Sequence, residues 1–208
     1  MEIIVIKTDN IDYTAFEPYL SCVTPARRAV VTKKASDSDK VQSLIAGLLL
    51  RSELSKRTGT PFKKISFVKG PHGKPYIKGG DVQFSVSHTK GAVCVALADA
   101  EDGEIGVDIE RCDRRVSDRI KERTLSENEQ MFAYNDEGFL RIWVKKEAFL
   151  KRTGIGVATD LKGADTTLLP DTIEYLFGEY FVGVSGKGAD QAKISELSVN
   201  DLLSRFVL

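Results

Sequence analysis

Apolar residues recur at helical spacing in the first half of the chain. Between Asp39 and about Arg57 they fall three and four residues apart, which forms one stripe along a helix. The members of this stripe are Val41, Leu44, Ile45, Leu48 and Leu49. The polar cluster Ser36–Asp39 can cap the start of this helix, and Gly59 can end it. The pattern therefore predicts a long amphipathic helix over 39–57.

Shorter apolar or alternating runs predict strands on both sides of this helix. They cover 2–6, 65–68, 84–86 and 92–98 in the first half and 105–110 at the start of the second, with a turn at 70–73. The second half repeats the order, with short helices near 115–134, a longer helix near 137–152, strands near 172–177 and 180–184, and a short helix around 201–206. Both halves place helix before strands. This order predicts an α+β fold of two similar halves packed side by side.

Length and composition narrow the class of protein. The chain has 208 residues, 42% hydrophobic and 29% charged, enough to bury a core without disulfides or a structural metal. Its longest apolar runs, 44–50 and 92–98, are far shorter than the roughly 18 to 20 residues that span a bilayer. The chain begins with an acid where a signal peptide has a cation, and its three cysteines lack metal-site spacing. We expect a cytoplasmic protein.

The net charge of zero conceals an uneven distribution along the chain. Residues 1–80 hold 14 basic and 7 acidic residues, whereas residues 81–140 hold 7 basic and 14 acidic ones. Such asymmetry is compatible with an anionic ligand meeting a site that also attracts cations, or with scattered surface charge. The basic residues are dispersed and not interleaved with stacking aromatics, so we expect no nucleic-acid partner.

The run Val107-Asp108-Ile109-Glu110 alternates apolar and acidic side chains. In a strand, Asp108 and Glu110 then project from one face and Val107 and Ile109 from the other. Two neighbouring carboxylates suit a hard divalent cation such as Mg²⁺, which takes oxygen ligands. An ordinary half-buried strand with one solvent-facing side gives the same alternation.

A third carboxylate comes from the helix predicted near 137–152. Trp143, Glu147 and Lys151 are spaced by four, so they lie almost in line on one helix face. The alternative is an exposed Glu147–Lys151 ion pair beside a packing tryptophan, worth a few tenths of a kcal/mol. The segment Thr153–Gly156 can end the helix, and its glycine backbone can lie close to a ligand.

Side chains that could donate hydrogen bonds to a phosphate cluster in the first half of the chain. Lys74 precedes Pro75 in a predicted turn, and Ser87 and His88 end a predicted strand. A lone histidine after a strand is more often a surface or core residue than a ligand. The sequence has no nucleophile elbow, Walker loop or dinucleotide-binding glycine pattern, and His72 and His88 lack zinc-site spacing.

Taken in this order, these segments resemble the 4′-phosphopantetheinyl transferases of the surfactin-synthetase-activating type. The motifs that carry the resemblance run through most of the chain in the family's order and spacing: Lys74-Pro75, Phe84–His88, Gly106–Glu110 and Trp143–Lys151. The resemblance implies two pseudo-symmetric α+β halves with the active site in the cleft between them. Residues 1–104 would recognise the nucleotide of coenzyme A, and residues 105–208 would supply the metal ligands and the catalytic helix.

The resemblance also implies a reaction. Enzymes of this family move the phosphopantetheine arm of coenzyme A to a serine of an apo acyl or peptidyl carrier protein and release adenosine 3′,5′-bisphosphate. Asp108, Glu110 and Glu147 would hold Mg²⁺, or Mn²⁺, against the pyrophosphate of coenzyme A. Lys151 would complement a pyrophosphate oxygen or the departing phosphate. Glu147, directly or through a metal-bound water, is the candidate for removing the serine proton.

In the first half, the resemblance places Lys74, Pro75 and Ser87 around the adenine end of coenzyme A. It places His88 on a phosphate and Arg27 near the 3′-phosphate.

Two departures from the family pattern concern this 3′-phosphate. Gln42 stands where relatives usually have an arginine, and Val30 where they often have a lysine. Compensation would have to come from nearby cations: Lys33, Lys34 or Lys40.

Glu129 has two interpretations. Some relatives have a glutamate here that has been considered as a base, but Ser126-Glu127-Asn128-Glu129 also has the form of a capping box, in which the glutamate accepts from a backbone N–H. We favour the cap.

Two other classes of function stay open at this point. A metal-dependent nucleotide phosphohydrolase would also use clustered carboxylates with lysine, and would produce free phosphate. A non-catalytic protein that binds coenzyme A or a carrier would not need the metal ligands. We expect a monomeric enzyme with coenzyme A and a carrier protein as partners, and no membrane partner.

Overall fold

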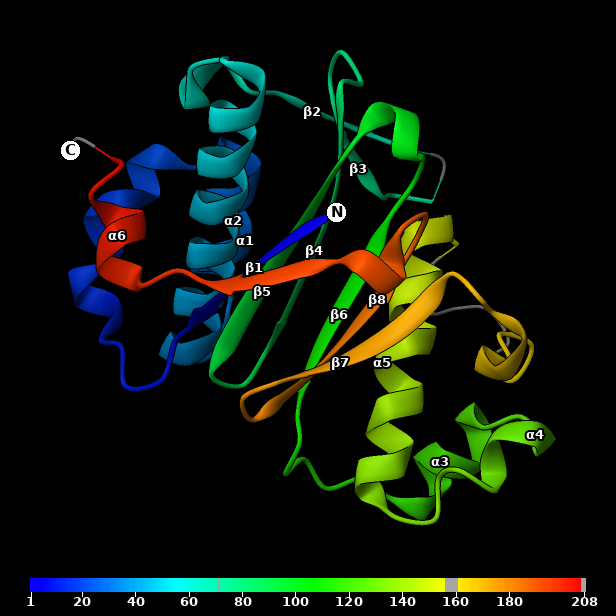
Figure 1. The fold of residues 1–208 in the computed structure, drawn as a ribbon. Helices are drawn as coiled ribbons and strands as arrows, with labels where there is room; N and C mark the ends of the chain where they lie inside the picture. Colours follow the sequence, from blue (N-terminus) through cyan, green and yellow to red (C-terminus); the bar gives the residue numbers. More distant parts are fainter. Residues whose placement is uncertain (71, 156–160, 207–208) are drawn as a thin grey trace.

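The computed structural model describes residues 1–70, 72–155 and 161–206, and in this part of the chain three sheets are flanked by helices (Figure 1). The first half contains β1 (Glu2–Lys7), α1 (Pro25–Thr32), α2 (Asp37–Thr58), β2 (Phe67–Lys69), β3 (Pro75–Ile77), β4 (Val82–Thr89) and β5 (Ala92–Asp99). The second half contains β6 (Gly106–Arg111), α3 (Asp118–Thr124), α4 (Glu127–Gln130), α5 (Asp136–Thr153), β7 (Thr172–Phe177), β8 (Tyr180–Ser185), β9 (Lys193–Glu196) and α6 (Val199–Leu203). This is the predicted α+β fold.

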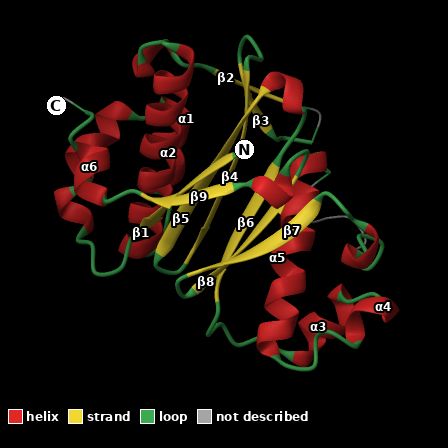
Figure 2. Cartoon of the chain, in the orientation of Figure 1, coloured by secondary structure: helices red, strands yellow, loops and turns green. Residues whose placement is uncertain are grey.

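The sheets join segments that are far apart in the sequence (Figure 2). The first sheet has the order β4-β5-β1-β9, in which β1 runs antiparallel to β5 and parallel to β9. The second sheet, β6-β8-β7, is antiparallel and sets Asp108 opposite Gly183. The end of the chain therefore returns to the first half, where β9 extends its sheet and Leu202 of α6 enters the core around α2. The division after residue 104 stays a prediction.

The long helix α2 begins and ends as its sequence predicts. The Ser36 hydroxyl accepts a hydrogen bond from the Asp39 amide at 3.1 Å, and Gly59 ends the helix with a φ of 68°. That left-handed conformation favours glycine because it lacks a Cβ. The five stripe residues are each at most 1% exposed, since α2 covers the outer face of the first sheet.

Three apolar clusters hold the layers together. One lies between α2 and the first sheet, and another between the two sheets, where Val5 and Cys94 meet Val107 and Val182. A third lies under α5 and includes Phe139 and Phe181. Helices α2 and α5 are thus on opposite sides of the paired sheets (Figure 1).

Several elements differ from the sequence prediction. The helix α1 and the strands β3 and β9 were not expected, and α6 covers 199–203 instead of 201–206. The strand expected at 65–68 is β2, which covers 67–69 and pairs with β3. In the turn between them, the Gly73 amide donates to the Gly70 carbonyl at 3.0 Å. Pro71 of that turn lies outside the described residues. Strands of three or four residues exist only because a partner strand pairs with them, which local patterns do not reveal.

Two further findings concern membrane-spanning helices and the cysteines. No helix within the described ranges has both the length and the apolar character needed to cross a membrane. Cys22, Cys94 and Cys112 are free thiols.

Candidate active site

The strand β6 brings two carboxylates to the side of the second sheet that faces α5. Val107 and Ile109 are at most 1% exposed and pack between the sheets, so Asp108 and Glu110 point the other way. Asp108 is itself only 5% exposed. The alternative of an ordinary solvent-facing strand side is therefore wrong at Asp108, because α5 covers it.

Helix α5 lies close to the sheet because two glycines leave room for its backbone. A Cβ on Gly106 would stand 1.8 Å from the Ala148 carbonyl oxygen, and one on Gly183 would stand 2.0 Å from that of Val144. Such distances are impossible for a real side chain, so any other residue would push α5 outward. The close approach sets Glu147 and Lys151, the neighbours of Ala148 along the helix, beside β6.

Lys151 joins α5 to both halves of the chain. Its ammonium donates to Asp108 Oδ1 at 2.6 Å and to Ser87 Oγ at 2.7 Å, and Ser87 donates to the same Asp108 oxygen at 2.7 Å. Burial acts to lower the pKa of Lys151, but Asp108 and other anionic groups outweigh it and raise that pKa. Lys151 is therefore a fixed cation between strands β4 and β6.

Glu147 supplies the third carboxylate and faces the same region. Within the described chain, Glu147 Oε1 and Asp108 Oδ2 are buried oxygens without a hydrogen-bond partner. Burial, followed by the nearby Asp108 charge, raises the pKa of Glu147 above its ordinary value. The exposed Glu147–Lys151 pair considered above is not formed, since Lys151 binds Asp108 instead.

Glu110 is held by two partners that the sequence does not suggest. Arg114, in the turn after β6, donates to Glu110 Oε1, and Thr89 donates to Glu110 Oε2 at 2.9 Å. Arg114 also lies over the Trp143 ring, 5.6 Å from its centroid. Burial raises the pKa of Glu110, with Asp108 adding to the effect and Arg114 opposing it.

The donor chemistry of this cluster fits a hard divalent cation. Its groups are carboxylate oxygens, and two of them, on Asp108 and Glu147, are buried with no partner among the described residues. Among the described residues, no three His, Cys, Asp or Glu side chains lie close enough together to hold a metal ion as they stand. The two oxygens without partners and the mutual proximity of the acids are what make the cluster a candidate metal site.

Ser87 belongs to the carboxylate cluster because of the strand period of β4. Ser85, Ser87 and Thr89 share the face toward β6, where the Ser85 hydroxyl accepts from the Val107 amide at 3.0 Å. Phe84 and Val86 share the other face and pack toward α2. The Ser87 hydroxyl binds Asp108 and Lys151, and its expected place near adenine stays a prediction.

A cavity of about 390 Å³ lies between α2, β4 and α5. Its lining combines the expected nucleotide-binding residues with the end of α5: Arg27, Lys74, Pro75, His88, Glu147, Lys151 and Gly154. A second cavity, lined by Ser87, His88, Asp108, Glu110, Trp143, Glu147 and Lys151, continues it. All nine residues predicted for the site therefore line one of these two cavities.

Basic groups gather at the wall of the first cavity, next to α1. Burial lowers the pKa of Arg27, and it lowers the pKa of His88 together with the cations of Lys34 and Lys151. Gln42, which replaces the usual arginine, is only 4% exposed. Of the three lysines considered as replacements, Lys40 pairs with Asp37 at 2.8 Å, and the Lys34 charge acts on His88.

Lys74 connects the two halves instead of extending into open space. Its ammonium donates to the carbonyl oxygens of Arg152 at 2.8 Å and Ile105 at 3.2 Å. Gly154, with a φ of 72°, ends α5 beside the Lys74 side chain, as its sequence predicts. Gly156, the other glycine of this segment, lies outside the described residues. Burial lowers the pKa of Lys74, and the Glu104 carboxylate opposes that effect.

Glu129 forms the predicted capping box. Its Oε2 accepts from the Ser126 amide at 2.8 Å, and the Ser126 hydroxyl accepts from the Glu129 amide. The same carboxylate binds Lys146 at 2.7 Å and the Thr166 amide at 2.8 Å, and both ion-pair partners are 0% exposed. Because its oxygens are committed to these contacts, Glu129 is a structural residue.

Fold and site define a two-half α+β protein whose acidic and basic side chains meet where the halves join. The family model described as 4′-phosphopantetheinyl transferase, N-terminal, matches residues 11–101, and that of the 4′-phosphopantetheinyl transferase superfamily matches residues 104–195. The chain belongs to this superfamily, whose members are enzymes that transfer phosphopantetheine to carrier proteins.

Individual relatives agree with this assignment. The chain is 27% identical to the 4′-phosphopantetheinyl transferase Sfp of Bacillus subtilis, over 74% of this chain and 70% of that protein. It is 28% identical to the L-aminoadipate-semialdehyde dehydrogenase-phosphopantetheinyl transferase of Xenopus laevis, covering 74% of this chain but only 56% of that one. With the transferase AcpT of Salmonella typhimurium it shares 34% identity, over 61% of this chain and 65% of the relative.

Proposed function

We propose that this chain binds a divalent cation, Mg²⁺ or Mn²⁺, through Asp108, Glu110 and Glu147, and uses it to transfer phosphopantetheine from coenzyme A to a carrier serine. The observation that carries the proposal is the pair of buried oxygens without partners, Asp108 Oδ2 and Glu147 Oε1, beside the fixed cation Lys151. When bound, the cation supplies positive charge that neutralises the pyrophosphate and orients the leaving group.

The side chains of the protein bind the pyrophosphate and accept the proton of the serine. Lys151 uses two of its three N–H donors on Asp108 and Ser87, which leaves one donor for a pyrophosphate oxygen. Glu147 is placed to accept the proton of the carrier serine, because its Oε1 has no hydrogen-bond partner among the described residues. The serine oxygen attacks the phosphorus, and adenosine 3′,5′-bisphosphate leaves with the electron pair of the broken P–O bond.

The decisive experiment is an intact-mass measurement on an apo carrier protein incubated with this chain, coenzyme A and Mg²⁺. The carrier is expected to gain one phosphopantetheine group. Release of free phosphate from coenzyme A without carrier modification would indicate a phosphohydrolase. Binding of coenzyme A or carrier without any product would indicate a non-catalytic binding protein.

We further propose that the two halves divide the labour, with residues 1–104 recognising the nucleotide and residues 105–208 supplying the metal ligands and catalytic helix. Arg27 and His88 in the cavity wall, with the Lys34 charge acting on His88, support the first assignment. A cytoplasmic location is supported by the three free cysteines, which suit a reducing compartment. A monomer without nucleic-acid or membrane partners stays a prediction.

Removing Arg27 is expected to reduce the preference for coenzyme A over dephospho-coenzyme A by about tenfold. Loss of one charged hydrogen bond weakens recognition of the 3′-phosphate, while Lys34 and His88 retain part of it. The effect should appear mainly in KM, because this phosphate is remote from the bond that breaks. The measurement compares kcat/KM for both nucleotides in wild type and Arg27→Ala.

Arg28→Ala is the matched control for this comparison. Arg28 lies on the same helix but is exposed, and its Nε donates to the Leu20 carbonyl at 3.1 Å. It should leave the nucleotide preference unchanged. An equal preference in wild type and Arg27→Ala would place the 3′-phosphate elsewhere or in solvent.

A further inference from the structure

The turn after β6 places an arginine on the candidate metal site. The Arg114 amide donates to the Arg111 carbonyl at 3.2 Å, which folds the chain back toward the end of β6, and buried Val116 anchors the following residues. The Arg114 side chain is 35% exposed and that of Glu110 is 15% exposed, so their ion pair lies at the mouth of the cavity.

Arg114 has two partners, and both belong to the site. Its Nη1 donates to Glu110 Oε1, and its guanidinium lies over Trp143, which is in the same cavity wall as Glu147 and Lys151. The planar guanidinium suits both contacts, because it pairs with a carboxylate while stacking on an aromatic face. Glu110 Oε1 is therefore paired with the Arg114 guanidinium.

We propose that Arg114 is a positioning residue that holds Glu110 while the metal is absent and releases it when the metal binds, thereby setting the metal affinity of the site. This inference rests on the metal site of the proposed function. Asp108 pairs with Lys151 through one oxygen and keeps its Oδ2 without a partner, whereas both Glu110 oxygens already have partners, Arg114 and Thr89. A metal ion therefore competes with the Arg114 guanidinium for Glu110, and its binding displaces Arg114. Thr89 is neutral and can keep its hydrogen bond to the other oxygen, which continues to orient Glu110.

The same contact provides a spectroscopic signal. Trp143 is the only tryptophan in the 208 residues, so the intrinsic tryptophan fluorescence of the protein comes from the ring beneath Arg114. Withdrawal of Arg114 from Glu110 changes the charge next to this ring. Mg²⁺ binding to the wild-type protein should therefore change the Trp143 emission.

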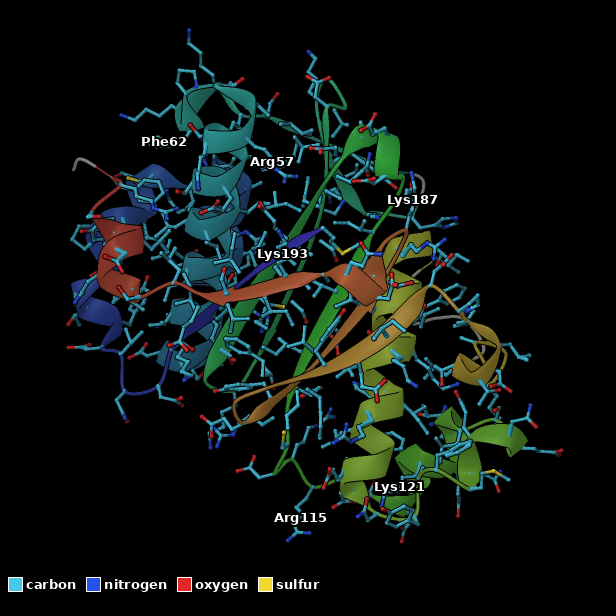
Figure 3. The ribbon with its side chains drawn as sticks, viewed as in Figure 1. Arg57, Phe62, Arg115, Lys121, Lys187 and Lys193 are labelled. Carbon is cyan, nitrogen blue, oxygen red and sulfur yellow. The ribbon has the colours of Figure 1, made fainter. Side chains whose placement is uncertain are left out.

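The test uses the full chain without coenzyme A. Mn²⁺ binding is followed by the electron paramagnetic resonance signal of the free ion, and Mg²⁺ binding by Trp143 emission, in wild type, Arg114→Met, Arg114→Lys and Arg115→Met. Arg115 is the matched control because its side chain is 94% exposed, pairs with Asp136 at 3.6 Å and extends away from the ribbon (Figure 3).

Arg114→Met is expected to bind Mn²⁺ about fivefold more tightly than wild type, because the competing cation is gone. Arg114→Lys should lie between them, since an ammonium keeps the charge but not the planar stacking. Arg115→Met should behave as wild type. The Mg²⁺-dependent change in Trp143 emission should be much smaller in Arg114→Met than in wild type.

Unchanged or weaker Mn²⁺ binding by Arg114→Met, with normal binding by wild type, would overturn the inference and leave the proposed function intact. Glu147→Gln tests whether the metal site itself is correctly assigned. If wild type bound no Mn²⁺, or if Glu147→Gln bound it as tightly as wild type, the metal site itself would be wrong and the role of Arg114 with it.

Discussion

Glu147→Gln is expected to lower the rate of phosphopantetheine transfer by roughly a hundredfold to ten-thousandfold, which is the range for loss of a general base. The amide has nearly the shape of the carboxylate but cannot accept the serine proton, and it is a weaker metal ligand because it carries no charge. Glu147 Oε1 has no hydrogen-bond partner among the described residues, so the substitution breaks no contact of that atom.

The rate is measured by intact mass of the carrier at saturating coenzyme A and Mg²⁺, with thermal melts to show that the variant is folded. Glu137→Gln is the control on the same helix, because Glu137 is exposed and pairs only across one turn with Arg141, at 3.1 Å. It should retain the wild-type rate. Normal turnover by Glu147→Gln would show that Glu147 is neither the base nor an essential metal ligand.

Lys146→Met is expected to lower the free energy of unfolding by about 3 to 5 kcal/mol, because it leaves the fully buried Glu129 carboxylate without its cation. Lys146 also donates to the carbonyl oxygens of Leu161 and Ala164, each at 2.8 Å. Methionine fills similar space but satisfies none of these acceptors. The measurement is urea denaturation followed by circular dichroism.

The adjacent lysine is the control for this experiment. Lys145 is partly exposed and pairs with Glu174 at 3.5 Å, so Lys145→Met should cost about 1 kcal/mol or less. Adding Glu129→Gln to Lys146→Met should recover part of the lost stability, since it removes the unpaired charge and keeps a carbonyl acceptor for Thr166. A double variant less stable than Lys146→Met would contradict the unpaired-charge explanation.

Local sequence patterns predicted those features of the fold that depend on a single helix or strand. The stripe from Val41 to Leu49 predicted α2, and Gly59 and Gly154 predicted the ends of two helices, because helix period and left-handed caps are properties of a single segment. The capping box at Glu129 was predicted for the same reason. None of these patterns contained information about the groups opposite them.

Contacts between distant segments were not predictable from the residues alone. The buried partner of Glu129 is Lys146, 17 positions along the chain, and nothing in the sequence singles out that lysine from Lys145 beside it. The pairing of β9 with β1 joins the two ends of the chain. Arg114 was overlooked because an arginine in a basic loop has no local sign of what it binds.

For the site, the sequence by itself determined which side chains share a face: Asp108 with Glu110 on β6, and Trp143, Glu147 and Lys151 along α5. The tertiary structure decided which of them meet. Lys151 pairs with Asp108 and Ser87 and not with Glu147, because Gly106 and Gly183 let α5 lie against β6 where β4 runs alongside. Backbone periodicity acts over a few residues and can be read along the chain. The charge, burial and hydrogen bonding of each carboxylate depend on elements that only folding brings together.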